Sequence, residues 1–188
     1  ARDRLGIKPL YYHFSGGRLF FASEIKALLV NNDIPRVLDK ISLARYLAHL
    51  YVPGPRTIFE GISSLPPAHY ISFDGGACEP QRWWDLDFTP RDISIEEAAD
   101  ELDSLLADAV KLNLVSDVPL GVFLSGGIDS SAVTALMSLA AGGRVKTFSI
   151  GFHEESFDER RFARMVAERY STEHEEFVVD YPDMADFL

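Results

Sequence analysis

Cysteine is nearly absent from the sequence, since Cys78 is the only one in 188 residues. A single cysteine cannot form an internal disulfide or build a cysteine-based metal site. The sequence also has no apolar run close to the roughly 20 residues that span a bilayer, and no charged-then-apolar leader opens it. We therefore expect a protein with no membrane partner in a reducing, cytoplasmic setting.

Basic residues are also in short supply, with 18 Lys and Arg against 29 Asp and Glu and a net charge of −11. An acidic surface repels the phosphates of nucleic acids unless its basic groups are clustered. We therefore expect small molecules, and no nucleic acid, as partners. The deficit is uneven, because residues 1–82 hold 10 basic and 7 acidic side chains while residues 83–188 hold 8 and 22. This shift indicates two regions.

The first region predicts a mixed α+β domain. Residues 7–14 and 19–22 flank Ser-Gly-Gly-Arg, a composition typical of a hairpin turn. Further elements expected in this region are a helix at 23–30, a helix at 42–51 with Ser42 as N-cap, and a strand at 69–73 with its turn at 74–76. We assign residues 1–76 to this domain. Residues 77–93 are expected to form a linker whose two tryptophans, Trp83 and Trp84, anchor it to a neighbouring domain.

The second region, residues 94–188, predicts an α/β domain. Ser94 and Glu97 fit a capping box that opens a helix with an apolar face. Strands are expected at 120–124, 145–152 and 175–179, with helices at 130–141, ended by Gly142 and Gly143, and at 158–170. This alternation predicts a parallel sheet with right-handed crossovers. Three such strands make a poor stand-alone sheet, so the region looks unfinished.

The loop at residues 124–131, with the sequence Leu-Ser-Gly-Gly-Ile-Asp-Ser-Ser, carries the main chemical signal. It lies between a strand and a helix, where α/β folds bind ligands. Its glycines allow close backbone approach, the helix amides favour an anion, and Asp129 could hold Mg²⁺ beside a phosphate. It has neither the lysine of a Walker A loop nor the spacing of a nucleophile elbow. On composition alone, an ordinary strand-to-helix turn is an equal alternative.

Resemblance to a known family decides between these alternatives. Residues 125–130 resemble the pyrophosphate-binding loop of the PP-loop ATP pyrophosphatases, and residues 116–124 narrow this to the synthetase domain of glutamine-dependent asparagine synthetases. Further segments resemble the same family in its own order: residues 2–12, 21–28, 55–62 and 65–70 its glutaminase domain, and residues 147–152 and 157–159 its synthetase domain. The chain thus resembles an internal fragment across the domain junction. It would contain the C-terminal part of an N-terminal-nucleophile glutaminase domain and the first strands and helices of a parallel-sheet ATP-binding domain.

The resemblance implies an activity. In this family glutamine is hydrolysed in the first domain, and ammonia attacks a β-aspartyl-AMP intermediate in the second, with release of AMP and pyrophosphate. The implied cofactors are ATP and Mg²⁺, and a homodimer is a possible assembly. The residues that the resemblance assigns to ATP are Leu124, Ser125, Gly126, Gly127, Asp129, Ser130 and Ile150. Asp129 is expected to bind Mg²⁺ through the pyrophosphate.

The sequence also departs from the family pattern. The family's glutaminase nucleophile is a cysteine at residue 1, whereas this chain begins with Ala1. By resemblance that cysteine is expected upstream and the synthetase Lys and Glu downstream of Leu188, so we expect no catalytic residue within the chain and no activity from it alone. Cys78 is interpreted as an incidental turn residue, and His174 as a structural histidine rather than a metal ligand.

Three alternatives stay open. One is a related PP-loop adenylating synthetase that acts on another carboxylate, such as a β-lactam-forming or sugar-linked amidotransferase. Another is a tRNA-modifying PP-loop enzyme, which the acidic second region disfavours and which salt-sensitive RNA binding would support. The third is a non-enzymatic interaction module, which would not bind ATP with Mg²⁺.

Overall fold

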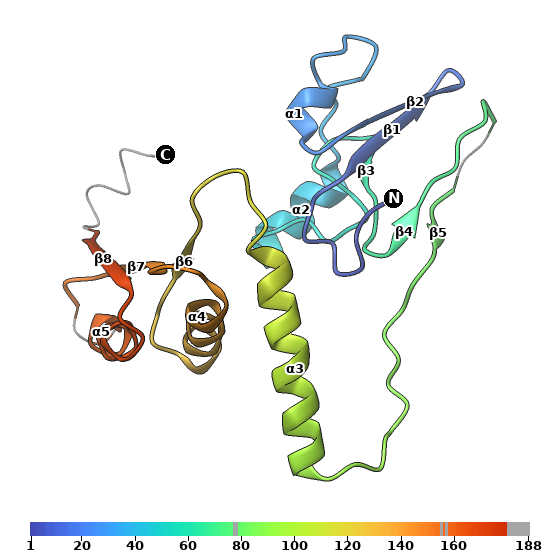
Figure 1. Ribbon diagram of the computed structural model, residues 1–188. Helices are drawn as coiled ribbons and strands as arrows, with labels where there is room; N and C mark the ends of the chain where they lie inside the picture. Colours follow the sequence, from blue (N-terminus) through green and yellow to red (C-terminus); the bar gives the residue numbers. More distant parts are fainter. Residues whose placement is uncertain (77–78, 155, 157, 180–188) are drawn as a thin grey trace. The chain divides into compact units, whose positions relative to one another are not determined.

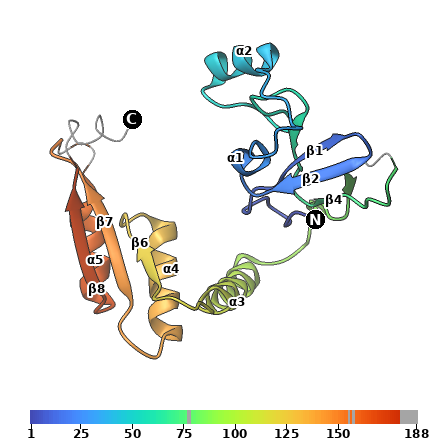
Figure 2. The same cartoon turned by 90° about the horizontal axis from the view of Figure 1, so that it is seen from above.

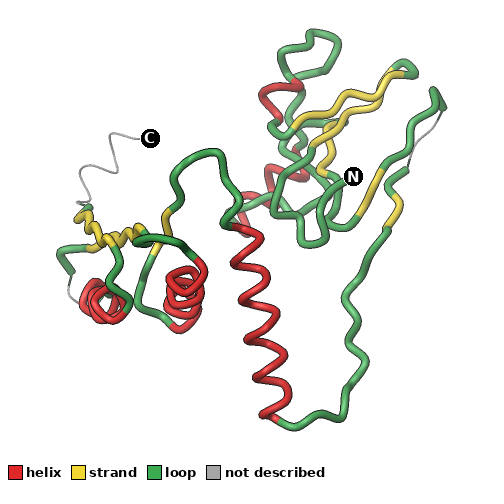
Figure 3. The backbone as a smooth tube through the Cα atoms, in the orientation of Figure 1, coloured by secondary structure: helices red, strands yellow, loops and turns green. Residues whose placement is uncertain are grey.

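The computed structural model describes residues 1–188 apart from 77–78, 155, 157 and 180–188 (Figure 1). Cys78 and Phe157, both considered above, therefore lie outside the described residues. The chain divides into two compact units, Ala1–Pro90 and Arg91–Leu188. Residues 83–94, around this division, form neither helix nor strand (Figure 3). The domain limits at residues 76 and 93 stay a prediction.

Unit 1 is built on a three-stranded antiparallel sheet. Strands β1 (Tyr11–Ser15) and β2 (Arg18–Ala22) form a hairpin, and β3 (Ile62–Ser64) pairs with the other edge of β1. Gly16 and Gly17 close the hairpin with φ of +58° and +70°, a conformation that glycine adopts without strain. The predicted hairpin is confirmed, although its first strand begins at Tyr11. Asp3 instead organises the preceding turn, because its carboxylate accepts the N–H groups of Ile7 and Lys8.

Two helices follow the hairpin in unit 1, and the first of them contributes to its core. Helix α1 (Ile25–Leu28) contributes Leu28 to a buried cluster with Ile34 and Ile62, and α2 (Lys40–His49) follows. The prediction that Ser42 caps α2 is wrong, because the N-cap is Asp39. Its carboxylate accepts the N–H of Ile41 at 2.9 Å and also binds Arg56. Ser42 is fully buried in the first turn, where its hydroxyl donates to the same carboxylate at 3.1 Å.

The tryptophans of the predicted linker are anchored in unit 1. Strand β4 (His69–Tyr70) pairs with β5 (Gln81–Arg82), which leads directly into Trp83. The Trp83 backbone N–H donates to the Ala68 carbonyl at 2.9 Å, and its indole N–H donates to the Arg2 carbonyl at 3.3 Å. The guanidinium of Arg4 lies 5.5 Å from the centre of the Trp84 ring. The expected anchoring is confirmed.

Unit 2 is an α/β unit whose elements follow the predicted order. It begins with α3 (Ile95–Asn113), which the Ser94–Glu97 capping box opens as predicted. The remaining elements are β6 (Gly121–Phe123), α4 (Ile128–Ala140), β7 (Lys146–Gly151), α5 (Arg160–Arg169) and β8 (Glu173–Val178). The three strands are parallel in the order β6-β7-β8. The predicted parallel sheet is therefore confirmed.

Helices α4 and α5 lie on the same face of this sheet (Figure 2). The strand order follows the chain, so two right-handed crossovers place both helices on one side. Leu124, Ala163 and Ala167 form the buried cluster between α5 and the sheet. Helix α4 ends just before Gly142, but the prediction that glycine terminates it is wrong. Ala141 is the C-cap, in an extended conformation, and neither Gly142 nor Gly143 has the positive φ of a glycine cap.

Within the described ranges of the chain, no helix combines the length and the apolar character that crossing a bilayer requires.

Candidate nucleotide-binding site

The loop between β6 and α4 is fixed to the sheet by its first residue. Leu124 is 2% exposed, and its N–H donates to the Phe148 carbonyl of β7 at 2.8 Å. The Leu124 carbonyl accepts the buried Ser149 hydroxyl. The loop therefore starts from a rigid point at the carboxyl ends of two parallel strands, which is the ligand-binding edge of an α/β sheet.

Gly126 is required by both its conformation and its surroundings. Its φ is +81°, a region that other residues rarely adopt. A Cβ atom here would lie 2.6 Å from the Ala163 nitrogen and 2.6 Å from the Phe162 carbonyl carbon. Because those are backbone atoms of α5, no side-chain movement could relieve the clash. The loop thus passes directly against the first turns of α5.

Two serine hydroxyls hold the remainder of the loop. The Oγ atoms of Ser125 and Ser130 lie 3.0 Å apart, and the Ser125 N–H donates to Ser130 Oγ at 3.3 Å. The Gly127 N–H donates to Ser125 Oγ at 3.2 Å, and the Ser130 hydroxyl donates to the Gly127 carbonyl at 3.2 Å. The loop is therefore curled around its own hydroxyls.

The amino end of α4 is suited to an anion. Gly127 is the N-cap, so no side chain caps the helix, and exposed Asp129 lies in the first turn. The N–H groups of a first helical turn point out of the helix, and the helix dipole adds partial positive charge. An anion can bind these groups. Asp129 would repel a bare phosphate, but it suits a Mg²⁺ ion that bridges carboxylate and phosphate.

A cavity of about 420 Å³ opens at the carboxyl ends of β6 and β7. Its lining residues are Phe123, Leu124, Ser125, Phe148, Ser149, Ile150, Phe152, Glu159 and Arg160. The structure thus brings Leu124, Ser125 and Ile150 together in one cavity, as the resemblance implies. The other residues predicted for ATP, Gly126, Gly127, Asp129 and Ser130, lie in the adjoining loop and first helical turn.

Arg160 forms one wall of the cavity, although the sequence indicated no site residue at this position. Its Nε and Nη2 atoms each lie 2.8 Å from an oxygen of Asp158, and these hydrogen bonds lower the pKa of Asp158 to about 2. A Cβ at Gly151 would collide with the Arg160 side chain, so glycine leaves room for it at the end of β7. The available signal was position, since residues 158–160 follow a strand at its ligand-binding end.

The arginines of α5 pair only in part with the residues that helical spacing predicts. Of Asp158, Glu159 and Glu168, Asp158 does bind Arg160, whereas Arg164 binds Glu176 of β8 through two hydrogen bonds of 2.6 Å. These bonds lower the pKa of Glu176, against the opposing effect of burial. The correction has a simple cause: the crossover places β8 beside α5, and spacing within one helix cannot reveal that pair.

His174 belongs to a network of polar side chains on strands β7 and β8. Its Nδ1 atom lies 2.9 Å from Thr147 Oγ1, and Nε2 lies 3.4 Å from a Glu176 oxygen. Among the residues that the structure describes, no group of three His, Cys, Asp or Glu side chains is placed to hold a metal ion.

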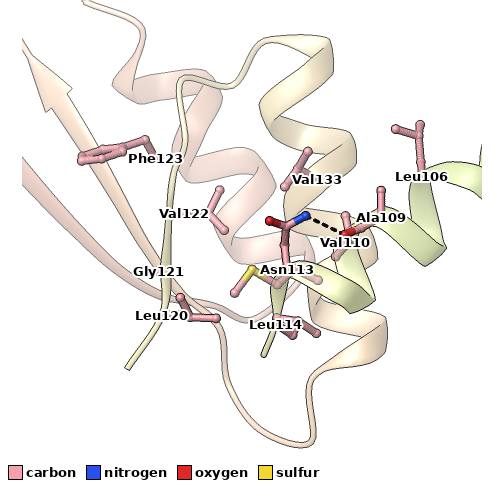
Figure 4. A pocket seen from close by; sticks show the side chains of 11 residues that line it. Leu106, Ala109, Val110, Asn113, Leu114, Leu120, Gly121, Val122, Phe123 and Val133 are labelled. Atoms are coloured by element: carbon pink, nitrogen blue, oxygen red, sulfur yellow. Dashed lines mark hydrogen bonds between the residues drawn. The ribbon is translucent and has the colours of Figure 1, made fainter. Parts of the chain in front are cut away.

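A second cavity of unit 2, of about 450 Å³, is apolar (Figure 4). It is lined by residues of α3, β6 and α4 and their flanks: Leu106, Ala109, Val110, Asn113, Leu114, Leu120, Gly121, Val122, Phe123, Val133 and Met137. Its amide side chain, Asn113, donates to the Ala109 carbonyl at 2.8 Å. With no charged group in its lining, this cavity offers no chemistry comparable to that of the first.

The fold and site define unit 2 as a parallel α/β unit with a glycine-containing loop and a cavity at the carboxyl ends of its strands. Comparison with known proteins identifies the family. A model described as "Glutamine amidotransferase domain" matches residues 1–84, and one described as "Asparagine synthase" matches residues 101–188. The chain therefore belongs to the glutamine-dependent asparagine synthetase family and spans the junction of its two domains.

Individual relatives agree with this assignment. The chain is 35% identical over 207 residues to asparagine synthetase (glutamine-hydrolyzing) 3 of Bacillus subtilis, an alignment that covers 100% of this chain and 33% of the relative. It is 34% identical over 194 residues to putative asparagine synthetase (glutamine-hydrolyzing) 2 of Methanocaldococcus jannaschii, covering 100% and 37%. Amidase chyE of Penicillium rubens is 34% identical over 190 residues, covering 89% and 27%. The chain spans about a third of the length of these curated relatives.

Proposed function

We propose that the gene product containing these residues makes asparagine from aspartate and ATP, with glutamine or ammonia as nitrogen donor. The reaction would pass through β-aspartyl-AMP and release AMP and pyrophosphate. The observation that supports this most directly is the hydrogen-bonded loop of unit 2, which meets the cavity containing Leu124 and Ile150. Family membership supplies the reaction class, and the relatives named as glutamine-hydrolyzing asparagine synthetases supply the substrates.

In this proposal the loop holds the β and γ phosphates of ATP. The hydroxyls of Ser125 and Ser130 and the backbone of Gly126 and Gly127 would surround the phosphates. Leu124 and Ile150 would contact the adenosine from neighbouring strands. Fixed donors of this kind stabilise the charge that develops on a leaving pyrophosphate.

Mg²⁺ fits the donor set at this loop. Asp129 provides an exposed carboxylate in the first turn of α4, and oxygen ligands shared between a carboxylate and phosphates are typical of Mg²⁺ sites. When bound, the ion would neutralise phosphate charge. Asp129 is therefore proposed as its protein ligand, acting together with the pyrophosphate of ATP.

We propose a glutaminase part at residues 1–76, a connection at 77–93 and a synthetase part at 94–188. The glutaminase cysteine and the synthetase Lys and Glu are proposed to lie outside residues 1–188, so this chain alone would catalyse neither half reaction. Detectable glutaminase activity in the purified chain would contradict that.

One comparison favours a second candidate for the acid substrate. A relative at 34% identity is named an amidase, Amidase chyE, and not an asparagine synthetase. We therefore keep a carboxylate other than aspartate as the alternative substrate. The residues that choose the acid are not among those that the site assigns.

The test follows pyrophosphate release from ATP and Mg²⁺ by the gene product that contains residues 1–188, with a panel of carboxylic acids. Ammonia or glutamine serves as nitrogen donor. We expect release that depends on aspartate and falls at least a hundredfold in Asp129→Ala, the range typical for loss of one electrostatic stabiliser. Release with another acid would keep the mechanism and change the substrate. Absence of release with every acid would contradict the proposed function.

A further inference from the structure

Glu159 is a carboxylate in the cavity with no assigned partner. It precedes α5 at the carboxyl end of β7 and lines the cavity together with Leu124 and Ile150. Within the described part of the chain, its side chain makes no hydrogen bond or ion pair. Its neighbour Asp158 is different, because both oxygens of that carboxylate are bound by Arg160. Glu159 is therefore the acidic side chain of this wall that remains available to a ligand.

The other cavity walls restrict what that ligand can be. Phe148, Ile150 and Phe152 offer apolar surface, which suits a flat base rather than a charged group. The other ionisable group of the lining, Arg160, is already paired with Asp158. A carboxylate accepts hydrogen bonds and donates none. The complementary ligand group is therefore one that carries O–H or N–H donors.

The negative charge of Glu159 also restricts the orientation of a bound nucleotide. A free carboxylate repels phosphate, so a nucleotide would place its phosphates at the amino end of α4 and turn another part towards Glu159. The ribose lies between base and phosphates and carries two neighbouring hydroxyls. In dinucleotide-binding α/β folds, a carboxylate after the second strand accepts a ribose hydroxyl. Strand β7 corresponds to that second strand, because it follows β6 and α4, the strand and helix on either side of the glycine loop.

We propose that Glu159 accepts hydrogen bonds from the ribose hydroxyls of the bound nucleotide and thereby selects ribonucleotides over deoxyribonucleotides. This inference rests on the proposed function, since it takes the cavity to be the nucleotide site. Charge-assisted hydrogen bonds are stronger than neutral ones, so removing the 2′-hydroxyl carries a measurable loss of affinity. Glu159 acts on specificity here and takes no part in the chemical step.

The experiment compares the affinities of ATP and 2′-deoxy-ATP, each with Mg²⁺, for the gene product that contains residues 1–188, by titration calorimetry. We expect the native protein to bind ATP about tenfold more tightly than 2′-deoxy-ATP, as the loss of one charge-assisted hydrogen bond predicts. In Glu159→Ala the two affinities become equal. Glu159→Gln, which keeps an acceptor oxygen, retains part of the preference. Glu168→Ala, a carboxylate change near the other end of α5, is the matched control and keeps the full preference.

The outcomes separate the two proposals. If the native protein binds ATP but shows no preference for it, or if Glu159→Ala keeps the preference, the role of Glu159 is refuted while the nucleotide site stands. If the native protein binds neither nucleotide, the proposed function fails and this inference with it. Because the Glu159 side chain has no partner among the described residues, we expect both Glu159 variants to have the melting temperature of the native protein.

Discussion

At the residue scale, Gly126 sets the path of the loop. Its positive φ and its approach to the α5 backbone mean that even a methyl group needs the loop or the helix to move. We predict that Gly126→Ala lowers the free energy of unfolding by about 1–3 kcal/mol, the usual range for a strained non-glycine conformation. It should also weaken ATP binding, because the amides of Gly126 and Gly127 would shift.

The matched control for this prediction is Gly142→Ala. A Cβ at Gly142 meets nothing within 4 Å, and its φ is not positive. Replacing such a glycine reduces the entropy of the unfolded chain, so we expect a neutral or slightly stabilising effect. Thermal unfolding followed by circular dichroism compares the two variants. Equal melting temperatures would show that the loop tolerates a side chain at residue 126.

At the element scale, the start of α3 depends on its capping box. Ser94 and Glu97 satisfy each other's backbone N–H groups, at 3.1 Å and 2.9 Å. Ser94→Ala removes one of these bonds and should cost about 1 kcal/mol in urea unfolding. Ser104→Ala, in the exposed interior of the same helix, should be neutral or stabilising because alanine is the better helix former. A larger loss in Ser104→Ala would contradict this account of α3.

Helix α5 is tied to β8 by charge, which predicts a pH dependence. Arg164 lowers the pKa of Glu176 below its ordinary 4.5, and Arg160 lowers that of Asp158 from 3.8 to about 2. A carboxylate whose pKa is lower in the folded state stabilises the fold above its unfolded pKa. That stabilisation is lost as the pH falls through the folded pKa. We therefore expect unit 2 to lose stability between about pH 4.5 and about pH 2.

Substitution of Arg164 tests that explanation. Arg164→Gln removes the partner of Glu176, so the melting temperature should differ less between pH 7 and pH 3 than in the native chain. Arg169→Gln, which changes a basic residue in the last turn of the same helix, should leave the difference as it is. An undiminished difference in Arg164→Gln would mean that other groups carry the acid sensitivity.

At the scale of the whole molecule, local signals predicted the elements well. The capping box of α3, the Gly-Gly hairpin and the alternation of strands and helices each depend on neighbouring residues, and each is confirmed. The loop at residues 124–130 was found for the same reason. Its assignment to ATP came from resemblance and stays a prediction.

Long-range features could not be predicted in this way. The pairing of Arg164 with Glu176 needs the crossover that sets α5 beside β8, and the cavity needs the earlier crossover that pairs β6 with β7. Asp39, and not Ser42, caps α2, because its carboxylate accepts the N–H of Ile41 and also binds the distant Arg56. In each case the partner lies far along the chain, where spacing carries no information.

The central claim is that the loop before α4 binds the phosphates of ATP with Mg²⁺ held by Asp129. The most direct measurement is the affinity of the gene product containing residues 1–188 for ATP, with and without Mg²⁺. It is repeated for Asp129→Asn and for Asp100→Asn, which changes an exposed carboxylate of α3. We predict that Mg²⁺ tightens ATP binding about tenfold or more in the native protein and in Asp100→Asn, and not in Asp129→Asn. An unchanged Mg²⁺ effect in Asp129→Asn, or no ATP binding at all, would contradict the claim.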